Sequence, residues 1–359
     1  MEVTGVRQQQ AWQQAVLPPV EQVRPGLWSI PVPIPDNPLR YVLVYAFELP
    51  DGVAIVDPGW DCDEAWHSLV TGLRTVGYDI AEVRAVLVTH LHPDHFGLVG
   101  RVRAASGAWV AMHRADAALL RHHEPAEAFG WARESQGQLR RAGAPEYLCS
   151  GHHAVPLVRF DRCAGAEVLL GDGDRLDLPG WNLHAVGTPG HTPGHLCLFE
   201  RDLGVLLSGD HVLPRISPHI SLIPGQLADP LTSYLGSLRK IAALDVDEVL
   251  PAHEYRFRGL AERVGALLSH HAERLAEIER AVAELPGATA WQLTTRLTWS
   301  RPIESMHERL LRFALRETLA HLVVLQGTCR LRASGDAVER WFPISVVDDA
   351  GLVPASTFR

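Results

Sequence analysis

Short runs of apolar residues, each followed by turn-forming residues, dominate the chain from Gly26 to about His253. Continuous or alternating apolar runs predict strands, and apolar residues three and four positions apart predict helices. Because strands and helices alternate in two similar halves, we predict an α/β fold of two mixed sheets packed face to face with helices outside. The pattern predicts strands at 27–34, 41–49, 53–60, 85–90, 108–113, 166–170, 181–186, 196–200, 205–210 and 248–253, and helices at 62–76, 98–106 and 230–243.

Three regions do not follow this alternation of strands and helices: an arm, an insertion and a C-terminal region. Residues 1–24 show little periodicity and are expected to form an N-terminal arm before a catalytic domain at 25–260. Residues 114–165 are helix-prone and rich in Arg, His and Glu, which predicts an inserted helical cap over the site. Helical spacing at 270–285, 289–297 and 304–327 precedes a hairpin turning at 334–336, which is typical of a winged-helix domain. We therefore predict a winged-helix-like domain at 261–345 and a tail at 346–359.

Composition narrows the class of protein. The chain of 359 residues carries a net charge of −9, so its overall charge does not attract nucleic acids or anionic membranes. No apolar run approaches the roughly 18 residues of a membrane span, and no secretory signal is visible. The cysteines are odd in number and never form a C-x-x-C pair, which favours a reducing compartment, by default the cytoplasm. They are Cys62, Cys149, Cys163, Cys197 and Cys329.

The clearest candidate chemistry lies at the end of a buried strand, in Thr89-His-Leu-His-Pro-Asp-His-Phe-Gly97. His90 and His92, two residues apart, can point to one side and chelate one ion, and Asp94 and His95 can face a second. Imidazole nitrogen and carboxylate oxygen are suitable zinc ligands, and a catalytic zinc keeps one position open. The chain has 19 histidines, so some clusters arise by chance. Chance is the simpler explanation for three histidine pairs: His122-His123, His152-His153 and His270-His271.

Three later segments deliver similar residues where strands end. Gly187-Thr-Pro-Gly-His-Thr-Pro-Gly-His195 lies between two predicted strands, and its glycines let the backbone approach a site closely. Asp210 ends Ser208-Gly-Asp, and His253 lies in Pro251-Ala-His-Glu. Ligands in open α/β sheets bind beyond the carboxyl ends of the strands. The four segments together therefore predict one metal site.

In this order, T-H-x-H-x-D-H-x-G, T-P-G-H-T-x-G-H, S-G-D and A-H-E, the motifs resemble those of the metallo-β-lactamase superfamily, in its glyoxalase II-like branch, over roughly residues 25–260. The resemblance implies an αββα sandwich and two metal ions. It places His90, His92 and His191 on the first ion and Asp94, His95 and His253 on the second, with Asp210 bridging both. Asp57 would orient ligand imidazoles, and His195 is interpreted as structural.

The chemistry implied by this resemblance is hydrolysis. A hydroxide shared by two ions attacks the substrate, one ion polarises the substrate oxygen, and Asp94 can accept a proton in addition to binding metal. Because a histidine stands at position 92, the site lacks the carboxylate-rich character of the di-iron oxidoreductases of the same superfamily. Two zinc ions are therefore favoured, although iron or manganese stays open.

We predict that the substrate is a small acyl compound such as a thioester, lactone or other ester. The alternative is an endoribonuclease or phosphodiesterase that acts on single-stranded RNA, since a winged helix can bind nucleic acid. Residues 261–345 hold 11 Arg against 10 Asp and Glu, which gives no basic stripe for phosphates. That region is instead expected to pack on the catalytic domain, complete the pocket or form a homodimer. A main activity on β-lactams is disfavoured by Asp210, where β-lactamases of this fold carry Cys or no metal-binding acid, and a non-catalytic binding protein is disfavoured by the complete ligand set.

Overall fold

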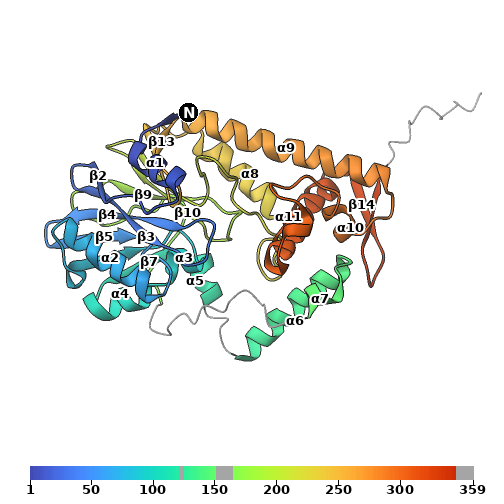
Figure 1. Ribbon diagram of the computed structural model, residues 1–359, viewed down its shortest axis with the longest axis horizontal. Coiled ribbons are helices and arrows are strands. Elements are labelled where there is room, and N and C mark those ends of the chain that lie inside the picture. Colours follow the sequence, from blue (N-terminus) through green and yellow to red (C-terminus); the bar gives the residue numbers. More distant parts are fainter. Residues whose placement is uncertain (121–124, 151–164, 345–359) are drawn as a thin grey trace, which may run out of the picture.

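Two β-sheets lie face to face in the computed structural model, which describes residues 1–120, 125–150 and 165–344 (Figure 1). A seven-stranded sheet has the order β2-β3-β4-β5-β6-β7-β8, and a six-stranded sheet has the order β1-β13-β12-β11-β10-β9. Both sheets mix parallel and antiparallel pairs. The strands are β1 (Glu2–Val3), β2 (Glu21–Arg24), β3 (Leu27–Pro33), β4 (Tyr41–Leu49), β5 (Gly52–Val56), β6 (Val83–Leu87), β7 (Trp109–His113), β8 (Val168–Leu170), β9 (Leu183–Gly187), β10 (Leu196–Glu200), β11 (Val205–Gly209), β12 (Glu248–Pro251) and β13 (Phe257–Arg258).

Helices cover the outer face of each sheet. The apolar sides of α2 and α4 pack on the seven-stranded sheet through Leu69 and Val102, and those of α8 and α9 pack on the six-stranded sheet through Leu238 and Val264. The helices are α1 (Val6–Gln14), α2 (Asp63–Thr75), α3 (Pro93–Phe96), α4 (Val99–Ser106), α5 (Arg114–Leu120), α6 (Pro125–Arg141), α7 (Glu146–Cys149), α8 (Pro230–Ile241), α9 (Leu260–Glu284), α10 (Ala290–Thr294) and α11 (Glu308–Gly327). The predicted α/β fold of two mixed sheets flanked by helices is confirmed.

The core between the sheets is formed by residues of both inner faces. Leu43 and Phe47 of one sheet share a cluster with Leu198 and Leu207 of the other, and all four are at most 1 % exposed. Burying such a side chain contributes about 1.5–3 kcal/mol. Tyr45 also donates its hydroxyl hydrogen to the carbonyl of Pro251 at 2.9 Å. Polar and apolar contacts therefore both hold the two sheets together.

The N-terminal segment differs from the expected arm. Residues 1–24 contain β1, α1 and β2, and both strands belong to the sheets. Gln8 is fully buried, where its amide bonds Ser29 Oγ at 3.0 Å, and Trp12 packs edge-on against Tyr41 with ring centroids 5.7 Å apart. These are contacts with distant residues, which local periodicity does not report.

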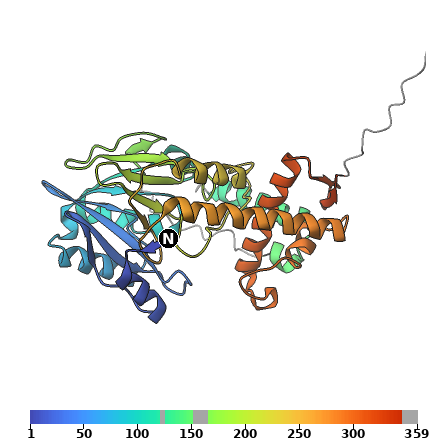
Figure 2. The same ribbon diagram turned by 90° about the horizontal axis from the view of Figure 1, so that it is seen from above.

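The described helices of the insertion contribute to a second lobe. In this lobe, α6 and α7 pack with α10, α11 and the far half of α9, through a core that includes Leu139, Cys149 and Leu319. Figure 2 shows α9 running from the sandwich into this lobe. Because Val264 near the start of α9 packs on the six-stranded sheet, the expected boundary at 260/261 falls at the start of a helix that belongs to both parts.

The second lobe ends in a hairpin of β14 (Leu331–Ser334) and β15 (Arg340–Pro343), as the turn at 334–336 predicted. Three helices and a hairpin thus occur in the expected order, and a winged-helix relationship stays a prediction. The expected tail lies outside the described residues. Among the helices that are described, none is both long enough and apolar enough to cross a membrane.

Candidate metal centre

The first group of expected ligands follows β6. The chain leaves the buried strand and turns at His90 and His92, with His92 in an extended conformation directly before α3. Pro93 then begins the helix, a position at which a missing N–H costs nothing. His90 Nε2 lies 3.0 Å from Nδ1 of His92. Asp94 and His95 occupy the first turn of α3 and are buried, so four potential ligands converge within one short segment.

The other expected ligands come from the six-stranded sheet. His191 lies in the loop between β9 and β10, Asp210 directly follows β11, and His253 follows β12, the parallel neighbour of β11. Gly209 brings Asp210 into place with φ +50°, and a Cβ atom there would lie 2.8 Å from Nε2 of His195. Only glycine tolerates both conditions without displacing its neighbours.

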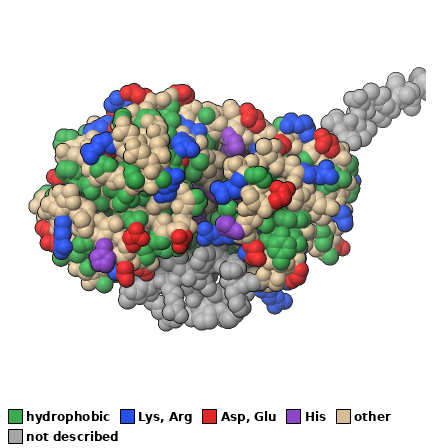
Figure 3. Space-filling view, in the orientation of Figure 1, with side chains coloured by type: hydrophobic (Ala, Val, Ile, Leu, Met, Phe, Trp, Pro, Cys, Tyr) green, Lys and Arg blue, Asp and Glu red, His purple; other side chains and the backbone are tan. Residues whose placement is uncertain are grey.

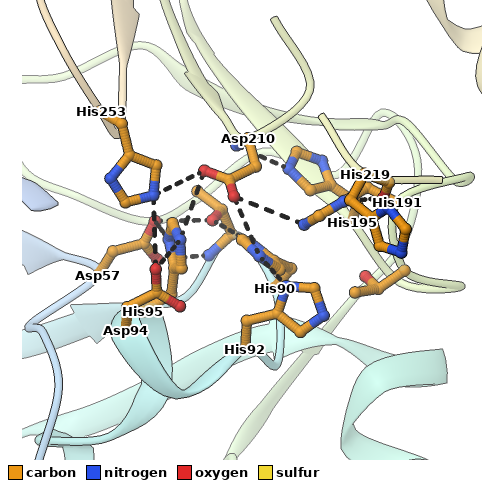
Figure 4. Close-up of polar contacts among 12 residues, drawn as sticks. Asp57, His90, His92, Asp94, His95, His191, His195, Asp210, His219 and His253 are labelled. Atoms are coloured by element: carbon orange, nitrogen blue, oxygen red, sulfur yellow. Dashed lines mark hydrogen bonds and ion pairs between the residues drawn. The ribbon is translucent and has the colours of Figure 1, made fainter. Parts of the chain in front are cut away.

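The carboxylate of Asp210 lies between two groups of side chains (Figure 4). Its Oδ2 atom is 3.5 Å from His191 Nε2 and 4.0 Å from His90 Nε2. Its Oδ1 atom is 3.2 Å from His253 Nε2 and 3.4 Å from His95 Nε2. The structure thus brings all seven expected ligands together as two sets: His90, His92, His191 and Asp210; and Asp94, His95 and His253, with Asp94 Oδ2 3.5 Å from His253 Nε2.

The donor atoms fit a pair of divalent cations. Nε2 of His95, His191 and His253 is buried without a hydrogen-bond partner, as is Oδ1 of Asp210. Buried polar atoms normally have partners, so this group of inward-facing orphans indicates a ligand. Nδ1 of the same imidazoles donates outward, at 2.8 Å in each case, to Asp57, to the carbonyl of His219 and to the carbonyl of Tyr41, respectively. Metal-binding histidines characteristically make such outer hydrogen bonds.

Electrostatics around the centre favour cations. Burial, followed by the neighbouring imidazoles, holds the pKa of His90 well below its usual range, so this ring is neutral at pH 7. His95 differs: burial acts against its charged form, but carboxylates, with Asp210 foremost, outweigh burial and raise the pKa of His95 to about 10. A neutral imidazole is ready to bind metal, and an excess of carboxylate attracts positive charge.

Asp57 makes the contacts of an orienting carboxylate. Its backbone has φ +56° at the end of β5, a strained conformation of the kind found at functional sites. Oδ1 accepts from Thr89 N at 2.8 Å, and Oδ2 accepts from Thr89 Oγ1 at 2.7 Å. With the bond from His95, these contacts tie β5 to the segment that carries four ligands.

Both ring nitrogens of His195 make hydrogen bonds within the protein. Nε2 accepts the backbone N–H of Asp210 at 3.2 Å, and Nδ1 lies 2.8 Å from Thr188 Oγ1. With both nitrogens engaged, this imidazole supports Asp210, and its structural role stays a prediction.

Sequence reasoning missed Asp116, a fully buried carboxylate in α5. It accepts from Leu91 N at 3.0 Å, Thr192 Oγ1 at 2.8 Å and Gly194 N at 2.6 Å. It thereby joins the segment of His90 and His92 to the loop of His191. Burial raises the pKa of Asp116 to about 6, against the lowering effect of these hydrogen bonds. No spacing marks this residue, because its partners lie more than 20 positions away on either side.

A cleft separates the sandwich from the second lobe, with histidine and basic side chains along it (Figure 3). The loop between β11 and α8, which carries His219, is held from the second lobe. Trp131 Nε1 donates to Pro224 O at 3.1 Å, Gln138 Nε2 donates to Leu222 O at 2.8 Å, and Leu222 N donates to Arg316 O at 3.2 Å. The described part of the insertion therefore contacts a loop beside the centre through these bonds, and a cap over the ligands stays a prediction.

Two of the three incidental histidine pairs, His122-His123 and His152-His153, lie outside the described residues. In the third pair, His271 is buried between α9 and α11, where its Nδ1 lies 3.2 Å from Nε2 of His321. This contact belongs to packing within the second lobe and not to the seven-ligand cluster.

The family model described as the metallo-beta-lactamase superfamily matches residues 37–253. The chain belongs to this superfamily. The matched range contains every side chain of the two metal-ligand sets, so the shared region is the one that builds the centre. The glyoxalase II-like branch stays a prediction.

Relatives extend the similarity beyond the sandwich. The chain is 27 % identical over 298 residues to "Probable metallo-hydrolase YqjP" of Bacillus subtilis, covering 80 % of this chain and 88 % of that protein. It is 32 % identical over 215 residues to "Acyl-coenzyme A thioesterase MBLAC2" of Gallus gallus, covering 57 % and 70 %. A crystal structure of a metallo-beta-lactamase family protein from Thermus thermophilus matches with a TM-score of 0.75 and 30 % identity, covering 90 % of this chain and 100 % of that one. The second lobe is thus shared with that protein.

Proposed function

We propose that this protein is a two-zinc hydrolase of small acyl thioesters. The observation that carries the proposal is the position of Asp210, whose two oxygens face different groups of imidazoles at 3.2–4.0 Å. A carboxylate placed in this way can hold two cations together, which is the arrangement of two-metal hydrolases. Imidazole and carboxylate donors favour zinc over the harder cations that prefer oxygen alone.

His90, His92 and His191 would hold the first ion, Asp94, His95 and His253 the second, and Asp210 both. When bound, the ions supply a hydroxide at neutral pH and polarise the substrate carbonyl. Asp94 would accept a proton at Oδ2, the oxygen that already faces His95 at 3.7 Å and His253 at 3.5 Å. The outer hydrogen bonds keep the imidazoles fixed during this transfer, so that little reorganisation opposes the reaction.

Two features support an acyl thioester as the substrate. The vertebrate relative is named as an acyl-coenzyme A thioesterase, and its similarity spans 70 % of its own length. The net charge of −9 and the near balance of charge at 261–345 offer little attraction for a nucleic acid backbone. A thiolate leaves more readily than an alkoxide or an amine, so hydrolysis of a thioester makes the smaller demand on a general acid.

The test is a substrate panel on protein with measured metal content. Acyl-coenzyme A esters of several chain lengths, acyl-glutathione, lactones and single-stranded RNA at low salt are compared, together with the Asp210→Asn variant. Asp202→Asn is the matched control, because Asp202 is exposed and its carboxylate bonds only Asn182 among the contacts described. We expect turnover of thioesters that Asp210→Asn loses and Asp202→Asn retains. Cleavage of RNA without thioester turnover would replace the proposal with the phosphodiesterase alternative.

A further inference from the structure

The ligand His191 depends on a carbonyl that is held from the second lobe. Its Nδ1 donates to the backbone oxygen of His219 at 2.8 Å. By contrast, the outer partners of His95 and His253 are Asp57 and the carbonyl of Tyr41, which both lie in the seven-stranded sheet or directly after one of its strands. Of these three imidazoles, His191 is therefore the one whose orientation depends on a loop outside the strands (Figure 4).

The side chain of His219 is fixed on three sides. Its Nδ1 lies 3.3 Å from Oε2 of Glu317, and its Nε2 bonds the hydroxyl of Ser221. The ring rests on Phe313 with centroids 4.6 Å apart and planes tilted by 43°. Glu317 and Phe313 both belong to α11, so one helix of the second lobe supplies two of the three contacts.

Glu317 is suited to hold this ring. Its side chain is 18 % exposed and lies in the middle of a 20-residue helix, so its own position is fixed by the packing of α11. Burial acts to raise the pKa of Glu317, but the hydrogen bond and charge of His219 outweigh burial and lower it to about 2. Glu317 is therefore a full carboxylate at neutral pH, and a charged acceptor makes the stronger kind of hydrogen bond.

We propose that Glu317 is a positioning residue of the metal centre: by holding the His219 ring it fixes the carbonyl that orients His191, and so it controls the first metal position from the second lobe. This inference rests on the metal centre of the proposed function, but not on the identity of the substrate. It assigns the second lobe a role in binding the first ion. The second ion, held by Asp94, His95 and His253, has no link to Glu317 through these contacts.

Loss of the Glu317 charge should weaken binding of the first ion alone. In Glu317→Gln, the shape is kept and the charge is lost, so the ring and carbonyl of His219 become less fixed. Loss of an outer partner of a metal-binding histidine typically lowers metal affinity about 10- to 100-fold. Because Glu317 acts one residue further out, we expect about the lower end of that range for the first ion and no change for the second.

The experiment titrates metal-free protein with Co²⁺ against a chelator and follows the visible absorption of each bound ion. We compare Glu317→Gln and Glu317→Asp with Glu308→Gln, which removes a carboxylate of the same helix that pairs with Arg312 at 3.1 Å. We expect Glu317→Gln to weaken one of two binding steps about tenfold and to shift its spectrum. Glu317→Asp should recover part of the affinity, and Glu308→Gln should leave both steps unchanged.

Two results would overturn the inference. Equal weakening of both steps, or unchanged binding with only a lower melting temperature, would mean that Glu317 merely stabilises the packing of the lobe. If Glu317→Gln does not fold, His219→Phe keeps the ring against Phe313 and removes both polar contacts, and it should weaken the same single step. The titration reports on the metal alone, so it decides the role of Glu317 even if no thioester is hydrolysed.

Discussion

Oδ2 of Asp57 accepts a hydrogen bond from Nδ1 of His95 at 2.8 Å, and this single contact joins the end of β5 to the first turn of α3. The bond points Nε2 of His95 toward Asp210, 3.4 Å away. It also places a negative charge behind the imidazole, which strengthens the ring as a ligand. A carboxylate outside the two ligand sets thus sets the direction of an imidazole within one of them.

Replacing this carboxylate should weaken metal binding without removing a ligand. We expect Asp57→Asn to lower the affinity for zinc about 10- to 100-fold, because the amide cannot supply the charge behind His95. Competition with a chelator measures the constant. Asp63→Asn is a suitable control, since Asp63 is 85 % exposed and pairs with Arg101 on the surface. Equal affinities for the two variants would contradict the role given to Asp57.

The two groups of ligands should be separable by mutation. His253 faces Oδ1 of Asp210, and His191 faces Oδ2, so His253→Ala should lose the second ion and keep the first. Asp210→Ala should reduce the content of both, because it removes the carboxylate between them. Metal analysis after dialysis checks this as a fall from about two ions per chain to about one in His253→Ala and fewer in Asp210→Ala. Retention of two ions in both variants would rule out the bridging arrangement.

Much of the sandwich and all of the metal-ligand cluster could be predicted from the sequence, because they follow from local order. Strands such as 41–49 and 205–209 are mostly apolar, and each ligand-bearing motif directly follows or precedes a strand of this kind. Strand ends gather at one edge of a sheet, so motifs far apart in the chain can be assigned to one site. The outer contacts could not be predicted in this way. Asp116 and Glu317 meet their partners only through the tertiary structure, 25 and 98 positions away.

The place of the insertion could not be predicted for a related reason. Helix-forming residues at 125–141 indicated a helix, but not the surface that it would cover. Buried polar contacts decide this: Arg316 of α11 bonds Ser135 of α6, and Arg312 donates to the carbonyl of Leu148 at 2.9 Å. Arginine is rarely fully buried, yet both of these side chains are less than 10 % exposed. Their burial joins α6 and α7 to the C-terminal helices.

The second lobe should lose stability in acid through His271. This imidazole is 1 % exposed, and burial, followed by the neighbouring His321, lowers its pKa to about 3. In the unfolded chain its pKa is about 6.5, so the unfolded state binds the proton first. The free energy of unfolding should therefore fall as the pH drops from about 6.5 toward 3, by up to about 1.4 kcal/mol per pH unit for this group.

Urea unfolding of metal-free protein between pH 7 and pH 4.5 measures this slope, and the absence of metal removes the separate effect of proton competition at the ligands. His271→Gln should flatten the slope, because it removes the ring that must take up a proton on unfolding. The control is His67→Gln, an exposed position on α2. Parallel curves for wild type and His271→Gln would show that acid acts elsewhere.

Replacing the buried carboxylate of Asp116 should affect both stability and metal binding, although Asp116 belongs to neither ligand set. Asp116→Ala would leave the N–H groups of Leu91 and Gly194 and the hydroxyl of Thr192 without their acceptor, and each unsatisfied buried group costs about 1–3 kcal/mol. Since water can partly replace the lost side chain, we expect a loss of about 2–4 kcal/mol in the free energy of unfolding. Asp177→Ala, at an exposed position, should change it by less than about 0.5 kcal/mol. Because the same bonds align the His90 and His191 segments, metal-free Asp116→Ala should also bind the first ion more weakly in a zinc titration. Weaker stability with unchanged zinc binding would limit Asp116 to folding and separate the two roles.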